Sequence, residues 1–284
     1  LPCYLQRWIN SKWETVWISQ PFSGFSGNMT TTGQPLVGDF DLDGEPETAV
    51  LPWYDVHILD LATGELEATG NYHPGKSDDD STTGRPYGFF GAYDFGGDAK
   101  SEFLIMGDFE MFLSVLGWEG EHLVELWDYQ IAKGIAQSTA VHDTGSAPVA
   151  DIDGDGQPEI VTSIYNENGD QRWHVIGFDG MTGTIEIDLA DRHLAGIADI
   201  SNDGVAELLV TQTDGSTIPD YGPIEILSAM GEEDTVIWRS ENSGFERLNL
   251  PTFPENVNSS ASWDRRSIFL DDRGPGSNLV FATR

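Results

Sequence analysis

The chain has 284 residues, of which 48 are acidic, 14 are basic and 39% are hydrophobic, and its formal net charge is −34. The hydrophobic content excludes a chain that is disordered throughout, and the charge argues against binding to nucleic-acid phosphates or to an anionic membrane surface. No apolar run approaches the roughly 18 residues that a membrane-spanning helix needs. The chain begins at Leu1 without a recognisable leader, so we interpret it as a processed or trimmed product.

Cys3 is the only cysteine, so neither an internal disulfide nor a cysteine-based zinc site is predicted. We expect an inert thiol, and a covalent link between chains is the alternative. The acidic, lysine-poor composition fits either a soluble surface with metal-binding carboxylates or an adaptation to high salt. Asn28 and Asn258 begin N-x-S/T triplets, which matter only in a host that glycosylates.

The first predicted element, at 4–19, is a hairpin of two β-rich runs. From residue 36 a longer unit recurs, made of an apolar run, an Asp-rich turn, a second apolar run and a β-rich hairpin. The glutamates that close the turns are spaced 55, 57 and 48 residues apart, at Glu47, Glu102, Glu159 and Glu207. The units occupy approximately 36–70, 88–128, 146–190 and 194–240. Helical periodicity is absent over any long stretch, so we expect little helix.

Each unit therefore holds four antiparallel strands, A to D, which is typical of a β-propeller blade. The C-terminal segment 267–284 supplies only strands A and B, and 4–19 supplies only C and D. Joining the two segments closes a ring of five blades and removes both free sheet edges. We therefore predict an all-β fold with a single five-bladed propeller domain over 1–284; the alternative is a piece of a seven-bladed ring.

The turn at 151–159, DIDGDGQPE, carries acids at positions 1, 3, 5 and 9 and glycine at position 6. A glycine there permits the positive φ with which such a turn can curl its carboxylates around one point. Oxygen donors of this kind favour Ca²⁺, and four carboxylates so close would repel without a cation. An EF-hand is disfavoured, because its closing glutamate is at position 12 between helices.

This turn and its β-rich surroundings resemble the FG-GAP/VCBS repeats of integrin-like propellers. The resemblance implies Ca²⁺ in the A–B turns, where it has a structural role, and an extracellular or periplasmic protein. Proteins with such repeats include adhesion ectodomains, lectins and some polysaccharide lyases.

The resemblance also implies a set of ligands for two to four calcium ions. Two turns match fully, with backbone carbonyls at position 7: Asp39, Asp41, Asp43, Glu45 and Glu47, and Asp151, Asp153, Asp155, Gln157 and Glu159. A third turn has a hydroxyl at position 3, so we expect weaker binding: Asp199, Ser201, Asp203 and Glu207. A fourth keeps only Asp94, Asp98 and Glu102, because Gly96 lacks a side-chain oxygen and Ala99 replaces glycine, and a plain turn is favoured there. The copy at 270–278, with Asn278 in place of the glutamate, has lost the pattern and is predicted to bind no ion.

Antiparallel alternation places the A–B and C–D turns on one face and the B–C and D–A loops on the other. That second face carries two long insertions, 70–86 and 241–266, beside loops 166–172 and 213–222. Long loops on a rigid scaffold are where binding residues concentrate. The candidates for a sugar or protein ligand are Tyr72, His73, Arg85, Asp170, Tyr221, Phe245, Trp263, Arg265 and Arg266; the alternative is a solvated loop surface. Five tryptophans are predicted to pack between blades: Trp13, Trp17, Trp118, Trp127 and Trp238.

No catalytic or nucleotide-binding motif is present, and the six histidines make no metal-binding spacing. The D-x-x-T-G pieces at 60–64 and 179–183 are too few for a quinone-binding propeller. We therefore expect a binding or adhesion module for a glycan or protein, at the cell surface, outside the cell or in the periplasm, rather than an enzyme. The alternatives are a structural subunit of a surface filament or complex, which would self-assemble or attach to a larger chain, and a polysaccharide-acting enzyme or its carbohydrate-binding part.

Overall fold

The described part of the chain is all-β. The computed structural model describes residues 3–20, 35–51, 55–71, 86–107, 112–130, 142–143, 149–166, 169–214, 223–229, 235–240, 269–271 and 278–280. Within these ranges the chain forms 21 strands and no helix, so no helix there could cross a membrane. The low helix content expected from the sequence is confirmed for these residues.

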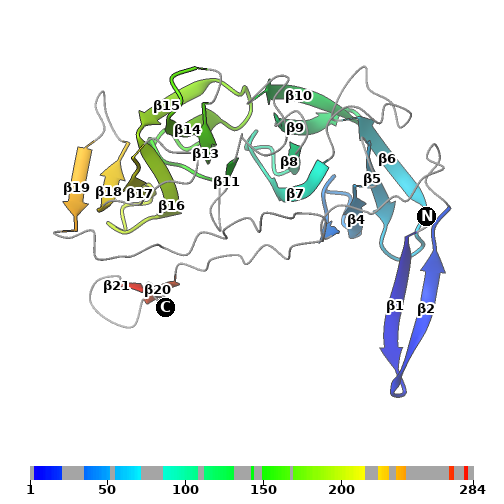
Figure 1. The fold of residues 1–284 in the computed structure, drawn as a ribbon. Coiled ribbons are helices and arrows are strands. Elements are labelled where there is room, and N and C mark those ends of the chain that lie inside the picture. Colours follow the sequence, from blue (N-terminus) through cyan, green and yellow to red (C-terminus); the bar gives the residue numbers. More distant parts are fainter. Residues whose placement is uncertain are drawn as a thin grey trace. The chain divides into compact units, whose positions relative to one another are not determined.

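Two compact units divide the chain, and each is described by itself. Unit 1 comprises 1–137 with 181–183, and unit 2 comprises 138–180 with 184–284. Each unit contains two larger antiparallel sheets, whose strands follow one another in chain order, and one two-stranded sheet, as Figure 1 shows.

The larger sheets of unit 1 are sheet I and sheet II, each of four strands. Sheet I consists of β3 (Leu36–Gly38), β4 (Glu47–Val50), β5 (Asp55–Asp60) and β6 (Leu66–Asn71). Sheet II consists of β7 (Pro86–Tyr93), β8 (Glu102–Gly107), β9 (Phe112–Glu119) and β10 (His122–Gln130). The four predicted strands of each repeat are therefore confirmed in this unit.

Unit 2 repeats the arrangement in sheet III and sheet IV. In sheet III two short strands, β11 (His142–Asp143) and β12 (Val149–Ala150), both pair with β13 (Glu159–Tyr165), followed by β14 (Trp173–Asp179) and β15 (Ile185–Ala190). Sheet IV consists of β16 (Arg192–Ala198), β17 (Glu207–Gln212), β18 (Ile224–Ser228) and β19 (Thr235–Arg239).

The core lies on the inner strands. All seven residues of β13 and all four of β4 are buried, so these strands pack on both faces. In contrast β6, on the edge of sheet I, alternates between exposed and buried residues, as expected of a half-buried strand. Separate hydrophobic clusters form in the two units, one around Phe103 and one around Leu208.

A β-bulge recurs at one register in the last strand of sheets I to IV. The extra residue is Glu67 in sheet I, Leu126 in sheet II, Glu186 in sheet III and Ile237 in sheet IV. A bulge bends its strand and redirects one side chain. A bulge repeated at one register shows that the four sheets share the same strand geometry. The four sheets are thus structural repeats, beyond the similarity of their turns.

The N-terminal hairpin, β1 (Tyr4–Ile9) and β2 (Lys12–Ile18), has the same bulge at Val16, followed by Trp17 paired with Leu5. Trp127 follows the bulge of β10 in the same way and pairs with Val115. The hairpin therefore has the register of a third and a fourth strand, as its sequence predicts.

Two of the tryptophans pack against glycines of D-x-x-T-G turns. The Nε1 of Trp17 donates to the carbonyl of Leu61 at 2.8 Å, and a Cβ on Gly64 would lie 2.5 Å from the Trp17 ring. Within unit 1, a Cβ on Gly183 would lie 2.5 Å from the ring of Trp127. These turns therefore need glycine for close packing, and the predicted packing role of Trp17 and Trp127 is confirmed.

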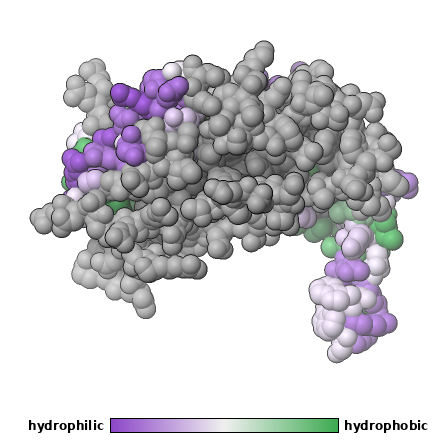
Figure 2. Space-filling model, viewed as in Figure 1, coloured by the Kyte–Doolittle hydropathy of each residue, from purple (hydrophilic) through white to green (hydrophobic). Residues whose placement is uncertain are grey.

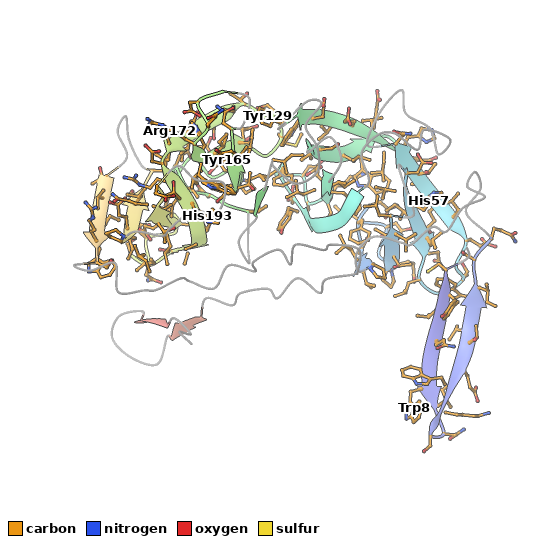
Figure 3. All side chains as sticks on the ribbon, viewed as in Figure 1. Trp8, His57, Tyr129, Tyr165, Arg172 and His193 are labelled. Carbon is orange, nitrogen blue, oxygen red and sulfur yellow. The ribbon has the colours of Figure 1, made fainter. Side chains whose placement is uncertain are left out.

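The other tryptophans differ. Trp118 is partly buried against the core of unit 1. Trp13 and Trp238 are 63% and 46% exposed, so the predicted packing between repeats is wrong for these two in the described structure. Trp13 instead meets Trp8 edge to face, with ring centroids 5.3 Å apart, near the hairpin tip where Figure 3 labels Trp8.

The two chain ends form separate two-stranded sheets. The C-terminal pair is β20 (Phe269–Asp271) and β21 (Asn278–Val280), and among the described residues neither strand pairs with β1 or β2. The predicted closing blade is therefore not seen, and the propeller ring remains a prediction. Asp271 pairs with Asn278 across six residues, whereas Gly38 pairs with Glu47 across eight. The last turn is thus two residues shorter than the first.

Candidate metal centre

All four Asp-rich turns share one backbone frame. In each turn the N–H of position 2 donates to the Oε2 of the closing glutamate at position 9, which is at most 5% exposed. The donors are Phe40, Phe95, Ile152 and Ile200, at 2.7, 2.8, 2.7 and 2.7 Å. The glutamate is therefore a hydrogen-bonded part of every turn, whether or not an ion is bound.

The aspartate at position 1 accepts the N–H of position 6, which draws the turn into a loop. The distances are 3.2 Å for Gly44 to Asp39, 2.9 Å for Ala99 to Asp94, 3.0 Å for Gly156 to Asp151 and 3.0 Å for Gly204 to Asp199. Position 6 has positive φ in all four turns, as predicted for glycine there. Position 4 also has positive φ, which the sequence analysis missed: Leu42, Gly97, Gly154 and Asn202.

The turns diverge at position 3. In sheets I and III, Asp41 and Asp153 accept the N–H of position 5, at 3.1 and 2.9 Å. In sheets II and IV position 3 has no carboxylate, and the N–H of position 5 donates to the aspartate of position 1, at 3.0 and 3.1 Å. The same backbone is thus held by two different sets of hydrogen bonds.

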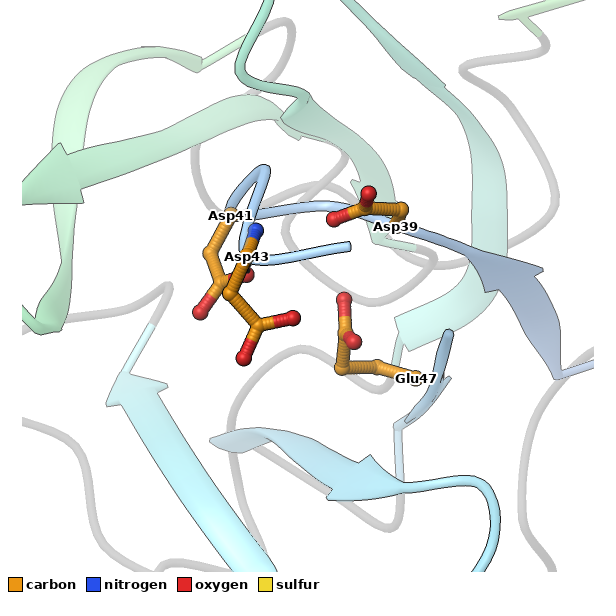
Figure 4. A group of neighbouring side chains, drawn as sticks. All are labelled: Asp39, Asp41, Asp43 and Glu47. Atoms are coloured by element: carbon orange, nitrogen blue, oxygen red, sulfur yellow. Dashed lines mark hydrogen bonds between the residues drawn. The ribbon is translucent and has the colours of Figure 1, made fainter. Parts of the chain in front are cut away.

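In the four described turns, acidic side chains converge only where position 3 is aspartate. Asp39, Asp41, Asp43 and Glu47 form one group, and Figure 4 shows their carboxylates around a common space. Asp151, Asp153 and Glu159 form a second group, which Asp155 does not join. Within each group one oxygen from every residue lies within 4.8 Å of the others. Both groups could hold a metal ion.

The remaining predicted ligands do not form such groups among the described residues. Asp199, Ser201, Asp203 and Glu207 lie in the turn of sheet IV, and Asp94, Asp98 and Glu102 lie in that of sheet II. The N–H groups of Glu45 and Gln157 donate to Asp43 and Asp155, at 2.8 and 2.7 Å. The ligand role of their carbonyl groups stays a prediction.

The electrostatics of the closing glutamates fit a cation site. Burial raises the pKa of Glu47 to about 7, and the charges of Asp41, Glu67 and Asp39 add to this, although the N–H of Phe40 opposes it. Burial likewise raises the pKa of Glu159 to about 7, together with Asp153, Glu186 and Asp151. Ionised carboxylates this close cost free energy unless a positive charge joins them.

Two further acids lie beside each group, and the sequence analysis did not predict them. Glu67 and Glu186, at the bulges of β6 and β15, have pKa values raised by burial and then by the charges of neighbouring aspartates. Asp60 and Asp179 pair directly with Glu47 and Glu159. At the positions equivalent by register to Asp60 and Glu67, sheet II has Gly117 and Leu126, and sheet IV has Ser228 and Ile237. Aligning the hairpin sequences on their T-G turns would have found both glutamates.

The donor chemistry fits a hard cation. Both groups offer only oxygen, and both lie in turns whose closing glutamate is already oriented. Ca²⁺ takes six to eight oxygen ligands in flexible geometry, whereas Mg²⁺ demands an octahedron and keeps several waters. Carboxylates from a turn and an adjoining strand therefore suit the larger ion better.

Of the predicted ligand-face residues, only Asp170 is among the described residues. Its carboxylate accepts from Asn166 Nδ2 at 3.1 Å and contacts His174 Nε2 at 3.1 Å. His174 Nδ1 lies 2.5 Å from Asp188 Oδ1. Burial alone would lower the pKa of His174, but the bonds to Asp188 and Asp170 outweigh burial and raise it. Asp170 therefore anchors its loop. The other candidates lie outside the described residues: Tyr72, His73, Arg85, Tyr221, Phe245, Trp263, Arg265 and Arg266.

No protein-family model matches the chain, and no curated protein does. Among solved structures, it is similar to a Bacillus licheniformis rhamnogalacturonan lyase, with 19% identity over 74% of this chain and 40% of that one and a TM-score of 0.44. It is also similar to an Agrocybe aegerita lectin that recognises non-reducing terminal N-acetylglucosamine, with 13% identity, 74% and 53% coverage and a TM-score of 0.40. A third similar structure is the V. cholerae biofilm matrix protein Bap1, with 18% identity, 81% and 42% coverage and a TM-score of 0.32.

This chain thus spans about half or less of the length of each of these proteins. Superpositions with TM-scores below 0.5 are too loose to assign a fold or an activity. The function is therefore argued from the residues of this chain.

Proposed function

We propose that this chain is an extracellular or cell-surface β-propeller, stabilised by calcium, that acts as a binding or adhesion module for a glycan or protein ligand. The observation that carries the proposal is the pair of carboxylate groups at one set of turn positions in sheets I and III. An ion at a fixed register in alternate repeats would hold turns and strands in place without taking part in chemistry. Extracellular calcium modules bind with Kd values of about 10⁻⁴–10⁻³ M, which suits partly exposed turns.

The propeller ring is part of this proposal. Four repeated sheets and a hairpin with the register of strands C and D support a fifth blade, closed by 4–19 and 267–284. In such a blade, the B–C register of the other sheets would set Gln6 opposite Leu279. In a Cys3→Ser background, Gln6→Cys with Leu279→Cys should form a disulfide within one chain. A link that forms only between chains would favour the alternative, a piece of a seven-bladed ring.

Calcium is tested by thermal unfolding with calcium and with chelator, while bound ions are counted by elemental analysis. We expect two ions per chain and a large loss of Tm on chelation. If no ion is bound and chelation changes nothing, the acidic groups are ordinary turns and the acidity is a surface property. A series of Tm values against salt would then test adaptation to high salt.

The binding role needs separate experiments. A glycan array and a protein-capture assay test for a ligand. Sedimentation across a concentration series tests the alternative of a self-assembling structural subunit. Incubation with acidic polysaccharides, followed by measurement of chain length, tests the alternative of an enzyme.

A further inference from the structure

A groove of about 340 Å³ lies within unit 1, between sheet I and sheet II. Its lining includes Asp41 from the β3–β4 turn, Glu67 from β6, Lys100 from the β7–β8 turn, Trp118 from β9 and Glu121 from the β9–β10 turn. Small-molecule sites range over about 300–1,000 Å³, so this groove suits one small unit of a ligand. It lies on the turn face, where the sequence analysis expected no ligand.

The aromatic wall of the groove is rigidly placed. Trp118 packs on the core of unit 1, and its Nε1 donates to the carbonyl of Ser101 at 3.1 Å. The Nζ of Lys100 lies 5.6 Å from the centroid of the Trp118 ring. The N–H of Ser101 donates to the carbonyl of Phe40 at 3.2 Å, which ties the two turns together. A fixed indole loses little conformational entropy when a ligand packs on it.

The charges of the groove restrict its ligand. Three carboxylates, on Asp41, Glu67 and Glu121, oppose one ammonium group, on Lys100. Carboxylates accept hydrogen bonds from hydroxyl groups and repel anions, and the ammonium group donates to ring or hydroxyl oxygens. An indole offers an apolar surface to the C–H face of a sugar ring. Acidic saccharides and phosphorylated ligands are thus disfavoured.

We infer that this groove binds a neutral sugar unit, which stacks on Trp118 and hydrogen-bonds to Glu67, Glu121 and Lys100. The inference rests on the proposed function, because it names the ligand class and the place for the binding role. Asp41 belongs both to the groove and to the candidate ion site, so calcium should preorganise one wall of the groove.

Unit 2 supplies a natural control. The positions of Asp41 and Glu67 are occupied there by Asp153 and Glu186, so the acids are kept. The positions of Lys100 and Trp118 are occupied by Val205 and Ala229, by register. The two units therefore share these two acids, but at these positions only unit 1 offers the indole and the ammonium group. Sugar binding should depend on unit 1 alone.

The test is binding of an array of neutral, acidic and amino-sugar oligosaccharides to the whole chain in saturating calcium, followed by titration calorimetry with the strongest neutral oligosaccharide. Glu67→Gln and Glu121→Gln should each weaken binding at least tenfold, and Glu186→Gln should leave it unchanged. Glu67→Gln and Glu186→Gln are matched, since each removes the bulge acid beside one ion site. Trp118→Phe should weaken binding with little change in Tm.

The outcomes separate the two proposals. If a neutral saccharide binds but none of the groove variants weakens it, the groove inference is overturned and the proposed function stands. If only acidic or amino-sugar oligosaccharides bind, the ligand class is wrong. If no saccharide binds while calcium still stabilises the chain, both the groove and the glycan form of the proposed function fall.

Discussion

The Asp-rich turns of sheets I and III and those of sheets II and IV have the same backbone and different chemistry. All four loops have positive φ at positions 4 and 6 and a buried glutamate that accepts the N–H of position 2. Only the first pair combines aspartate at position 3 with a glutamate at the bulge of the last strand. The backbone frame is therefore independent of the candidate ion site, for which side chains supply the acidic group only in sheets I and III.

The largest effect should come from removing both ion sites. In Asp41→Asn with Asp153→Asn, stabilisation by calcium should vanish, a loss of about 5 kcal/mol if each site contributes about 2.7 kcal/mol at a free calcium concentration of 100 Kd. Urea unfolding at several free calcium concentrations measures this loss. The matched control is Asp98→Asn with Asp203→Asn in sheets II and IV. Calcium dependence that survives in the first variant, or disappears in the control, would break the comparison.

A second prediction distinguishes the stability that the closing glutamate contributes through its hydrogen bond from the stability that it contributes through ion binding. In chelator, Glu47→Ala and Glu102→Ala should each destabilise by about 1–3 kcal/mol, because each leaves a buried N–H without an acceptor. In calcium, Glu47→Ala should cost more, since an ion is also lost, while the cost of Glu102→Ala should stay the same. Urea unfolding under both conditions measures this. Equal costs for the two variants in calcium would argue against an ion in sheet I.

A third prediction converts one kind of turn into the other. Ser201→Asp restores the missing carboxylate in sheet IV, so one additional ion should bind. The gain should be about 1.4 kcal/mol at a free calcium concentration of about ten Kd. In chelator the same variant should be less stable than the parent, because Asp199, Asp203 and Glu207 lie nearby. Ser201→Asn, which adds bulk without charge, is the control, and counting bound ions is the direct measurement.

The sequence predicted the repeats and the two turns in which acidic side chains converge, because these depend on residues within one nine-residue turn. It did not predict Glu67 and Glu186, because their nearness to the turn depends on a bulge in a strand that lies 20 and 27 residues, respectively, beyond the closing glutamate. It named Asp170 as a ligand-face candidate, and it did not predict the contact of that carboxylate with His174. Contacts across strands were thus the part that local pattern could not supply.

A smaller predicted effect is a pH dependence of stability that arises in sheet II and not at the equivalent positions of the other three sheets. Burial, followed by the charge of Asp128, raises the pKa of Glu125 to about 7, and the equivalent residues Leu66, Ile185 and Val236 are apolar. The folded state thus binds this proton more tightly than the unfolded chain, whose glutamate has an ordinary pKa of about 4.3. The destabilisation is absent below the ordinary pKa, grows as pH rises and is complete above about pH 7.

Glu125→Gln should therefore raise Tm at pH 8 and leave it unchanged at pH 4. Glu121→Gln, on the exposed turn of the same hairpin, is the control and should change Tm equally little at both values. A gain for Glu125→Gln that is the same at pH 4 and pH 8 would show that the gain does not come from ionisation.

The smallest predicted effect concerns position 6 of the turns, where sheet II has alanine in place of the glycine of the other three sheets. Position 6 has φ values of 94°, 89° and 97° at Gly44, Gly156 and Gly204, but the residue in sheet II is Ala99, at 71°. A Cβ on any of those three glycines would meet no atom within 4 Å, so backbone strain alone disfavours a side chain there.

Ala99→Gly should therefore stabilise sheet II, and Gly44→Ala should destabilise sheet I, each by about 1 kcal/mol or less. Urea unfolding in chelator measures both changes without a contribution from the ion. Two changes of opposite sign and similar size would show that the frame is one and the same in both kinds of turn. If Ala99→Gly were destabilising, the alanine would have a packing role, and the turn of sheet II would differ from the others in its backbone as well as in its side chains.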